Sequence, residues 1–111
     1  MAVFVLGASG CGGGDEKQVE EALMSYASAL RDRDFDRACD ALSERTREQI
    51  ESGGGGCPAN VEKAASRTGR ELLDPEIETV EIDGDTARVE LKGAETPAVL
   101  VKEEGDWKVG G

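Results

Sequence analysis

The spacing of apolar side chains changes near Pro75, and this change most constrains what the chain can fold into. Before Pro75, apolar residues recur three and four positions apart, which is the pattern of an amphipathic helix. After Pro75 they alternate with polar residues, as in a strand with one buried face. Helices followed by strands are typical of the α+β class. We therefore expect N-terminal helices packed on one face of a curved antiparallel sheet of three or four strands.

The first helix is expected over residues 15–31. Asp15 and Gln18 have the spacing of a capping box, which fixes where a helix begins. Five apolar residues of this segment share one helical stripe: Val19, Ala22, Leu23, Tyr26 and Leu30. The stripe predicts one face for the core and an opposite face for solvent.

Shorter helices are expected to follow. Asp34 and Ser43 are both placed to cap a helix, and Pro58 suits the first turn of another. The stripe after Asp34 consists of Phe35, Ala38, Cys39 and Leu42. The stripe after Pro58 consists of Val61, Ala64, Ala65 and Thr68. Because the side chains of this last stripe are small, we expect its helix to approach a neighbour closely.

The segment after Pro75 predicts an antiparallel sheet. Strands are expected over residues 77–82, 86–92, 98–101 and 107–109. Gly84 between two aspartates is a turn sequence, so the first two strands form a hairpin. The strand residues expected to face the core are Ala87, Val89, Leu91, Leu100, Trp107 and Val109.

The first eleven residues resemble the end of a lipoprotein signal sequence. An apolar run, residues 2–6, precedes the small residues Ala8, Ser9 and Gly10, and Cys11 follows directly. This order resembles the lipobox of bacterial lipoproteins, whose cysteine is acylated and becomes the new N-terminus. The resemblance implies that Cys11 carries the lipid and that the protein is extracytoplasmic and anchored to the cell membrane.

Two departures from the lipobox pattern affect this prediction. Ala8 stands where leucine is commonest, and no basic residue precedes Lys17. We therefore expect the true start codon to lie upstream of Met1. Residues 1–14 are predicted to be a signal remnant with a glycine linker, and residues 15–111 the domain. The alternative is an apolar N-terminus in which Cys11 has no role.

The chain has three cysteines, an odd number for an exported protein. If Cys11 carries lipid, Cys39 and Cys57 remain as a pair. An exported domain meets an oxidising compartment, where a disulfide between them would add about 3 kcal/mol of stability. No metal site is expected because the chain has no histidine and no CxxC motif.

The charge of the chain excludes one class of partner. Its formal net charge is −11, from 24 acidic and 13 basic residues, and it has no basic cluster. Nucleic acid is excluded because phosphate binding depends on clustered positive charge. The acidic residues between Glu76 and Asp85 alternate over both faces of a strand, so we expect no calcium site and no other cofactor there.

The order of elements resembles the NTF2-like superfamily, also called SnoaL-like or cystatin-like, and in particular small actinobacterial lipoproteins of that fold. The segments that carry the resemblance are ASGC, RDRDFDRACDALS, GGCPANVE, VEIDGDTARVEL and LVKEEGDWKV, together with the first helix. The resemblance implies a cone formed by a curved sheet and helices. The open end of such a cone holds a small molecule or faces a partner.

Enzymes of that superfamily place Tyr, His or Asp inside the cone, and this chain has no histidine. A catalytic alternative of the isomerase, dehydratase or cyclase type would use Tyr26 with Asp36 or Asp40. Tyr26 occupies a position of the apolar stripe, where packing accounts for it, and both aspartates lie off their stripe. We therefore expect a domain that binds without catalysing.

The candidate ligand pocket consists of Tyr26, Phe35, Leu100 and Trp107. Its expected occupant is a small hydrophobic ligand, and an envelope protein is the alternative partner. Another alternative is a structural subunit that forms a homodimer through the exposed face of the sheet.

Overall fold

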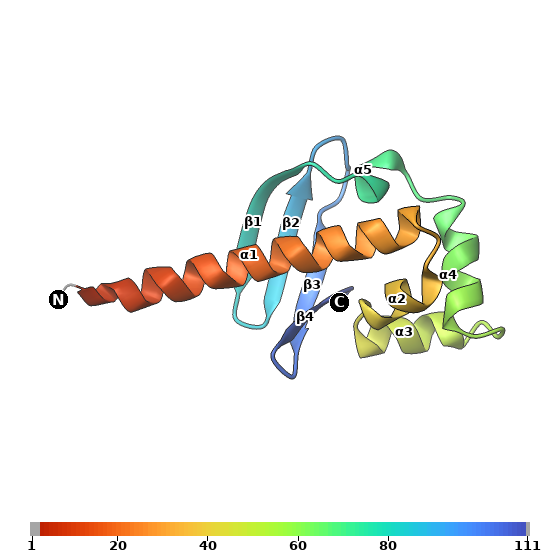
Figure 1. Cartoon of the computed structure of the whole chain (residues 1–111), viewed down its shortest axis with the longest axis horizontal. Helices are drawn as coiled ribbons and strands as arrows, with labels where there is room; N and C mark the ends of the chain where they lie inside the picture. Colours follow the sequence, from red (N-terminus) through yellow and green to blue (C-terminus); the bar gives the residue numbers. More distant parts are fainter. Residues whose placement is uncertain (1–2, 111) are drawn as a thin grey trace.

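The computed structural model describes the backbone of residues 3–110 and the side chains of residues 14–110. In this part of the chain, helices come first and a four-stranded antiparallel sheet follows, so the α+β prediction is confirmed (Figure 1). The helices are α1 (Val3–Arg31), α2 (Phe35–Asp40), α3 (Glu44–Glu51), α4 (Cys57–Ala65) and α5 (Arg70–Leu73). The strands are β1 (Ile77–Asp83), β2 (Thr86–Leu91), β3 (Ala98–Glu103) and β4 (Asp106–Val109).

The start of α1 differs from the expectation. The helix begins at Val3 and passes through Gly12, Gly13 and Gly14, so the prediction that Asp15 caps it is wrong. Each glycine costs a helix about 1 kcal/mol relative to alanine, but no proline interrupts the segment and the helix continues across it. Asp15 instead places Oδ1 3.8 Å from Nζ of Lys102 on β3.

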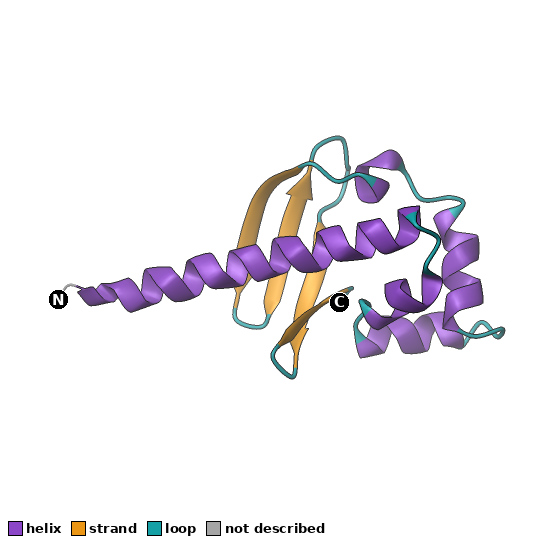
Figure 2. Cartoon of the chain, in the orientation of Figure 1, coloured by secondary structure: helices purple, strands orange, loops and turns teal. Residues whose placement is uncertain are grey.

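The helix α1 runs across one face of the sheet, and its N-terminal end projects beyond the strands (Figures 1 and 2). Apart from the neighbouring backbone of α1 itself, no described atom lies within 4 Å of a Cβ built at Gly14. The described part of the domain therefore does not cover α1 at Gly14.

The core divides into two clusters that α1 joins. The sheet cluster consists of Val19, Leu23, Ala87, Val89, Leu91, Leu100 and Trp107. The helical cluster consists of Ala29, Leu30, Ala38, Cys39, Leu42, Cys57 and Val61. Val109, at the end of β4, packs against both clusters. The predicted inward strand positions are confirmed, with Val109 half-buried and the others buried.

The sheet is a meander in the order β1-β2-β3-β4. Val80 and Ile82 pair with the buried Val89 and Ala87, so they share the inner face. Strict alternation would turn Ile77 to the outer face, but the register shifts between Ile77 and Thr79. This bulge lets Ile77 pack against the sheet cluster as well.

The two short hairpin connections, β1–β2 and β3–β4, turn through residues with positive φ. Gly84, with φ of 65°, is the first of two residues between β1 and β2, as a type II′ turn requires. Glu104 and Gly105, with φ of 53° and 88°, form the turn between β3 and β4, as in type I′. The turn predicted at Gly84 is confirmed.

The free edge of β4 is paired with the connection between α2 and α3. The amide of Val109 donates to Ala41 O at 2.8 Å, and the amide of Ser43 donates to Val109 O at 2.8 Å. Gly110 follows with φ of 105°, and a Cβ there would collide with the side chain of Thr46 on α3. These contacts join the sheet to the helical part of the molecule.

The short helices begin where capping residues were expected. The Asp34 carboxylate accepts from the Arg37 amide at 3.3 Å, and Ser43 Oγ accepts from the Thr46 amide at 3.2 Å. The predicted stripe of α4 is partly wrong: Val61 is buried and Ala65 packs against the helical cluster, but Ala64 is exposed. The helix α5 was not expected.

Candidate functional site

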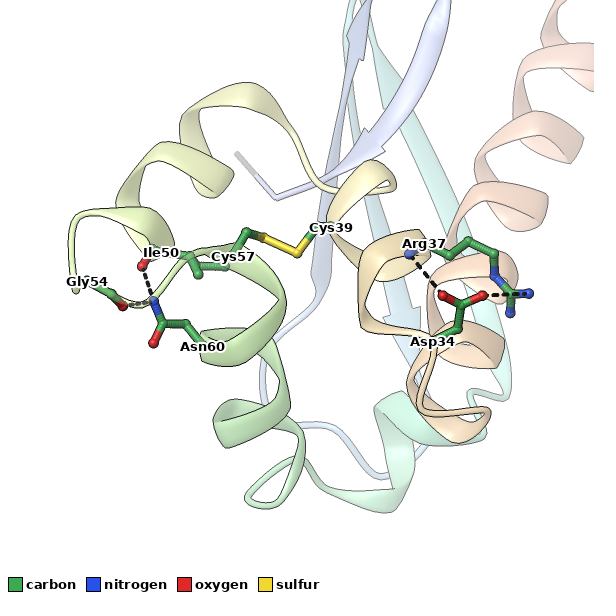
Figure 3. Close-up of a disulfide and its surroundings, with 7 residues drawn as sticks. All are labelled: Asp34, Arg37, Cys39, Ile50, Gly54, Cys57 and Asn60. Atoms are coloured by element: carbon green, nitrogen blue, oxygen red, sulfur yellow. Dashed lines mark hydrogen bonds and ion pairs between the residues drawn. A yellow bond between two sulfur atoms is a disulfide. The ribbon is translucent and has the colours of Figure 1, made fainter.

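The disulfide predicted from the cysteine count is present. Cys39 on α2 is bonded to Cys57 at the start of α4, with their Cα atoms 6.2 Å apart (Figure 3). Both cysteines are buried in the helical cluster. The side chain of Cys11, the predicted lipidation residue, lies outside the residues whose side chains the structure describes.

The glycine-rich loop before Cys57 is tied to its neighbours by one side chain. Asn60 Nδ2 donates to Ile50 O at 2.9 Å and to Gly54 O at 2.6 Å (Figure 3). The loop is therefore held between the C-terminal end of α3 and the first turn of α4, beside the disulfide. This arrangement accounts for a flexible sequence inside an ordered helical region.

The four residues predicted to form a ligand pocket are divided between the two clusters. Tyr26 and Phe35 pack against the helical cluster, whereas Leu100 and Trp107 belong to the sheet cluster. Leu100 is fully buried and fills the space beneath α1 together with Leu23. The interior of the sheet is thus occupied by the protein's own side chains at this point.

Tyr26 was the residue expected in the catalytic alternative. It is half-buried, and this burial raises the pKa of its hydroxyl above the ordinary value of 10.0. No hydrogen bond joins its hydroxyl to a described residue, and the two aspartates named with it, Asp36 and Asp40, are exposed. The structure therefore does not assemble a Tyr–Asp pair among these three residues.

Trp107 carries the one buried side-chain polar atom without a partner in the described part of the chain. The residue is 6% exposed, and its indole Nε1 is buried without an acceptor. Lys102, its cross-strand neighbour, places Nζ 5.8 Å from the centre of the ring, within reach of a cation–π contact. Packing in the sheet cluster accounts for the ring itself.

An open cleft of about 640 Å³ lies between α5, the β2–β3 connection and the end of β4. Apolar side chains make up much of its lining: Leu72, Leu91, Ala94, Pro97, Ala98, Val99 and Val109. Ligand cavities in proteins typically measure about 300–1,000 Å³ and are mostly apolar, so this cleft has the size and the character of a small-molecule site.

Two carboxylates, Glu71 and Glu95, complete the cleft, and its lining contains no lysine or arginine. A Cβ on Gly69 would collide with the Glu71 carboxylate, so this side chain folds back over the start of α5. Neither carboxylate forms an ion pair or hydrogen bond with another described residue. The cleft therefore combines an apolar floor with negative charge.

The prediction from sequence missed this cleft because its elements are distant along the chain. The sequence signal for α5 is short: Gly69 is followed by the four residues Arg70, Glu71, Leu72 and Leu73, and Pro75 then ends the segment. Leu72 packs against the sheet cluster and forms one side of the cleft.

Two further observations bear on the type of site. Among residues 14–110, no group of three or more His, Cys, Asp or Glu side chains is arranged to hold a metal ion. Within the described residues, no helix combines the length and the apolar character needed to cross a membrane.

No protein-family model, no curated protein and no solved structure matches this chain. The fold and the cleft define an α+β domain with a candidate small-molecule site.

Proposed function

We propose that this chain is a lipid-anchored protein of the bacterial cell envelope whose extracytoplasmic domain binds a small ligand without catalysing a reaction. The observation that carries the proposal is the bond between Cys39 and Cys57. It leaves Cys11 as the only cysteine of the sequence that this disulfide does not use. Disulfides persist mainly in exported proteins, and Cys11 follows the small residues of a lipobox-like sequence.

The geometry of α1 supports an anchor at Cys11. The N-terminal end of α1 projects beyond the sheet (Figure 1). The cleft lies against α5 and the sheet, so a lipid near that end of α1 would not meet it. One acyl chain gives weak, reversible membrane binding, and a second makes the anchoring stable. A lipidated cysteine in this region would hold the domain at the membrane surface with the cleft free.

The outer face of the sheet and the cleft are the two candidate surfaces for binding. Their composition supports a binding role for the cleft. On the outer face of β1 and β2, the paired residues are polar and exposed: Thr79, Glu81, Asp83, Thr86, Arg88 and Glu90. The cleft is mostly apolar. Apolar surface gives the larger gain on burial, so a hydrophobic ligand is expected there and not on the outer face. Tyr26, Asp36 and Asp40 are not part of the cleft lining.

Metabolic labelling with an alkyne analogue of palmitate tests the anchor. The protein expressed from its own locus is expected to take up the label, and Cys11→Ser is expected to abolish it. Ser9→Ala keeps a small residue before Cys11 and is expected to keep the label. Labelling that persists in Cys11→Ser would overturn the anchor.

A further inference from the structure

We infer that the cleft selects a small organic cation with an apolar body, such as a primary or quaternary amine attached to a hydrocarbon or aromatic group. The inference rests on the proposed binding function and adds the charge of the ligand. Two features carry it: the apolar lining of the cleft, and the two carboxylates that belong to it, Glu71 and Glu95.

The apolar part of the cleft would hold the body of the ligand. Leu72 on α5 faces Leu91, Ala98 and Val109 of the sheet across a volume of about 640 Å³. Transfer of apolar surface out of water contributes about 25 cal/mol per Å². This contribution does not depend on charge, so it sets a common affinity for any ligand with the same hydrocarbon body.

The carboxylates would distinguish among such ligands. Glu71 and Glu95 come from different elements, the N-terminal end of α5 and the β2–β3 connection, and both line the same cleft. Arg70 and Lys92 are their nearest basic neighbours along the chain, but neither contributes to the lining. An anion placed in the cleft would meet two like charges without a compensating cation, whereas an ammonium group would pair with them.

The surrounding charge acts in the same direction. Residues 70–110, which include α5 and the whole sheet, contain 12 acidic and 5 basic side chains. A field of this sign raises the local concentration of cations near the cleft. Because this general effect acts on every cation, the contribution of Glu71 and Glu95 must be separated from it by experiment.

Three ligands with one hydrocarbon body, a phenyl ring and four methylenes, separate these contributions: 4-phenylbutylammonium, 4-phenylbutanol and 5-phenylpentanoate. Each is titrated into the full chain at low salt, and the backbone amides are followed by NMR. We expect the cation to bind about tenfold more tightly than the alcohol, and the anion more weakly than the alcohol. The amides that shift are expected to be those of the cleft, near Gly69 and Gly93.

The variant Glu71→Gln/Glu95→Gln is expected to abolish the preference for the cation and to leave the affinity of the alcohol unchanged. The variant Glu81→Gln/Glu90→Gln removes the same charge from the outer face of the sheet and is expected to keep the preference. Circular dichroism spectra of both variants would report whether the fold is retained.

Three results would overturn the inference. If both double variants reduce the affinity of the cation equally, the preference comes from net charge and not from the cleft. If the three ligands bind equally, the cleft binds hydrocarbons without selecting charge, and the proposed binding function stands without this inference. If none of the ligands shifts the cleft amides, both the inference and the binding part of the proposed function fail. The lipid anchor is tested separately, by the palmitate label.

Discussion

The sheet cluster and the helical cluster are stabilised by different means. The sheet cluster lies on four strands joined by continuous backbone pairing, and it buries large side chains such as Leu23 and Leu100 completely. The helical cluster is built from helices of 4 to 9 residues and the end of α1. Isolated helices shorter than about 12–15 residues are marginal in water. The disulfide lies in the region whose local structure is weaker.

The two regions also differ in charge. Residues 31–70 contain 8 acidic and 8 basic side chains, whereas residues 71–110 contain 12 acidic and 4 basic ones. In the helical region, opposite charges pair at the surface: Arg33 Nη2 lies 2.9 Å from Glu62 Oε2, and Arg37 pairs with Asp32. Exposed pairs of this kind contribute about 0–1 kcal/mol each. The disulfide is therefore the stronger constraint on this region, and the excess negative charge belongs to the region with the cleft.

The largest expected effect follows from removing the disulfide. The double variant Cys39→Ser/Cys57→Ser is expected to lose about 3 kcal/mol of unfolding free energy, because the closed loop of the unfolded chain is released. Native-state hydrogen exchange is expected to show the loss mainly in α2 and α4, with β2 and β3 less affected. Cys11→Ser is the matched control, since it replaces the remaining cysteine and leaves the disulfide intact. An equal loss of protection in the strands would mean that the two regions unfold as one unit.

The next effect concerns the contact between the two regions. Gly110→Ala is expected to cost about 2 kcal/mol, from a left-handed backbone and from the collision of the new Cβ with Thr46. Gly105→Ala, with φ of 88° and no atom within 4 Å of its Cβ position, is expected to cost only the backbone part, about 1 kcal/mol. Urea unfolding measures both. Equal costs would show that Thr46 moves freely and that this contact does not couple the regions.

The difference between the regions also explains which elements could be predicted from sequence. The strands were predicted because alternation and turn residues are local signals, as at Gly84. The bulge at Ile77 was missed because it depends on which face of β1 meets the core. In the helical region, Asp34 and Ser43 mark helix starts through their own hydrogen bonds, so these were predicted. The helix α5 has only four residues, so its apolar pattern is too short to be predicted from the sequence.

The candidate site was predicted in one part and missed in another. The pairing of Cys39 with Cys57 followed from the odd number of cysteines and from assigning Cys11 to lipid, and neither step needs knowledge of the fold. The cleft requires α5, the β2–β3 connection and Val109 to meet, and only the folded chain brings them together. Tyr26 and Trp107 were predicted to share a pocket, but α1 contributes to both clusters. Trp107 on β4 belongs to the sheet cluster, whereas Tyr26 on α1 packs against the helical cluster.

The smallest expected effect is a pH dependence that reports on the helical cluster alone. Burial raises the pKa of the Tyr26 hydroxyl above its ordinary value of 10.0, so the unfolded chain loses this proton at lower pH than the folded chain does. The contribution of Tyr26 to stability is therefore complete below about pH 10 and is lost as the pH rises through the folded pKa. The sheet cluster contains no titratable side chain, so it gives no corresponding change.

The chain has one tyrosine, so absorbance at 295 nm follows Tyr26 directly. The folded chain is expected to titrate at higher pH than the chain in concentrated urea. Stability measured between pH 9 and 11 is expected to fall more steeply for the native sequence than for Tyr26→Phe, which keeps the ring and removes the proton. A folded midpoint at or below the unfolded one would mean that water reaches the hydroxyl freely, and that the helical cluster does not bury Tyr26 in solution.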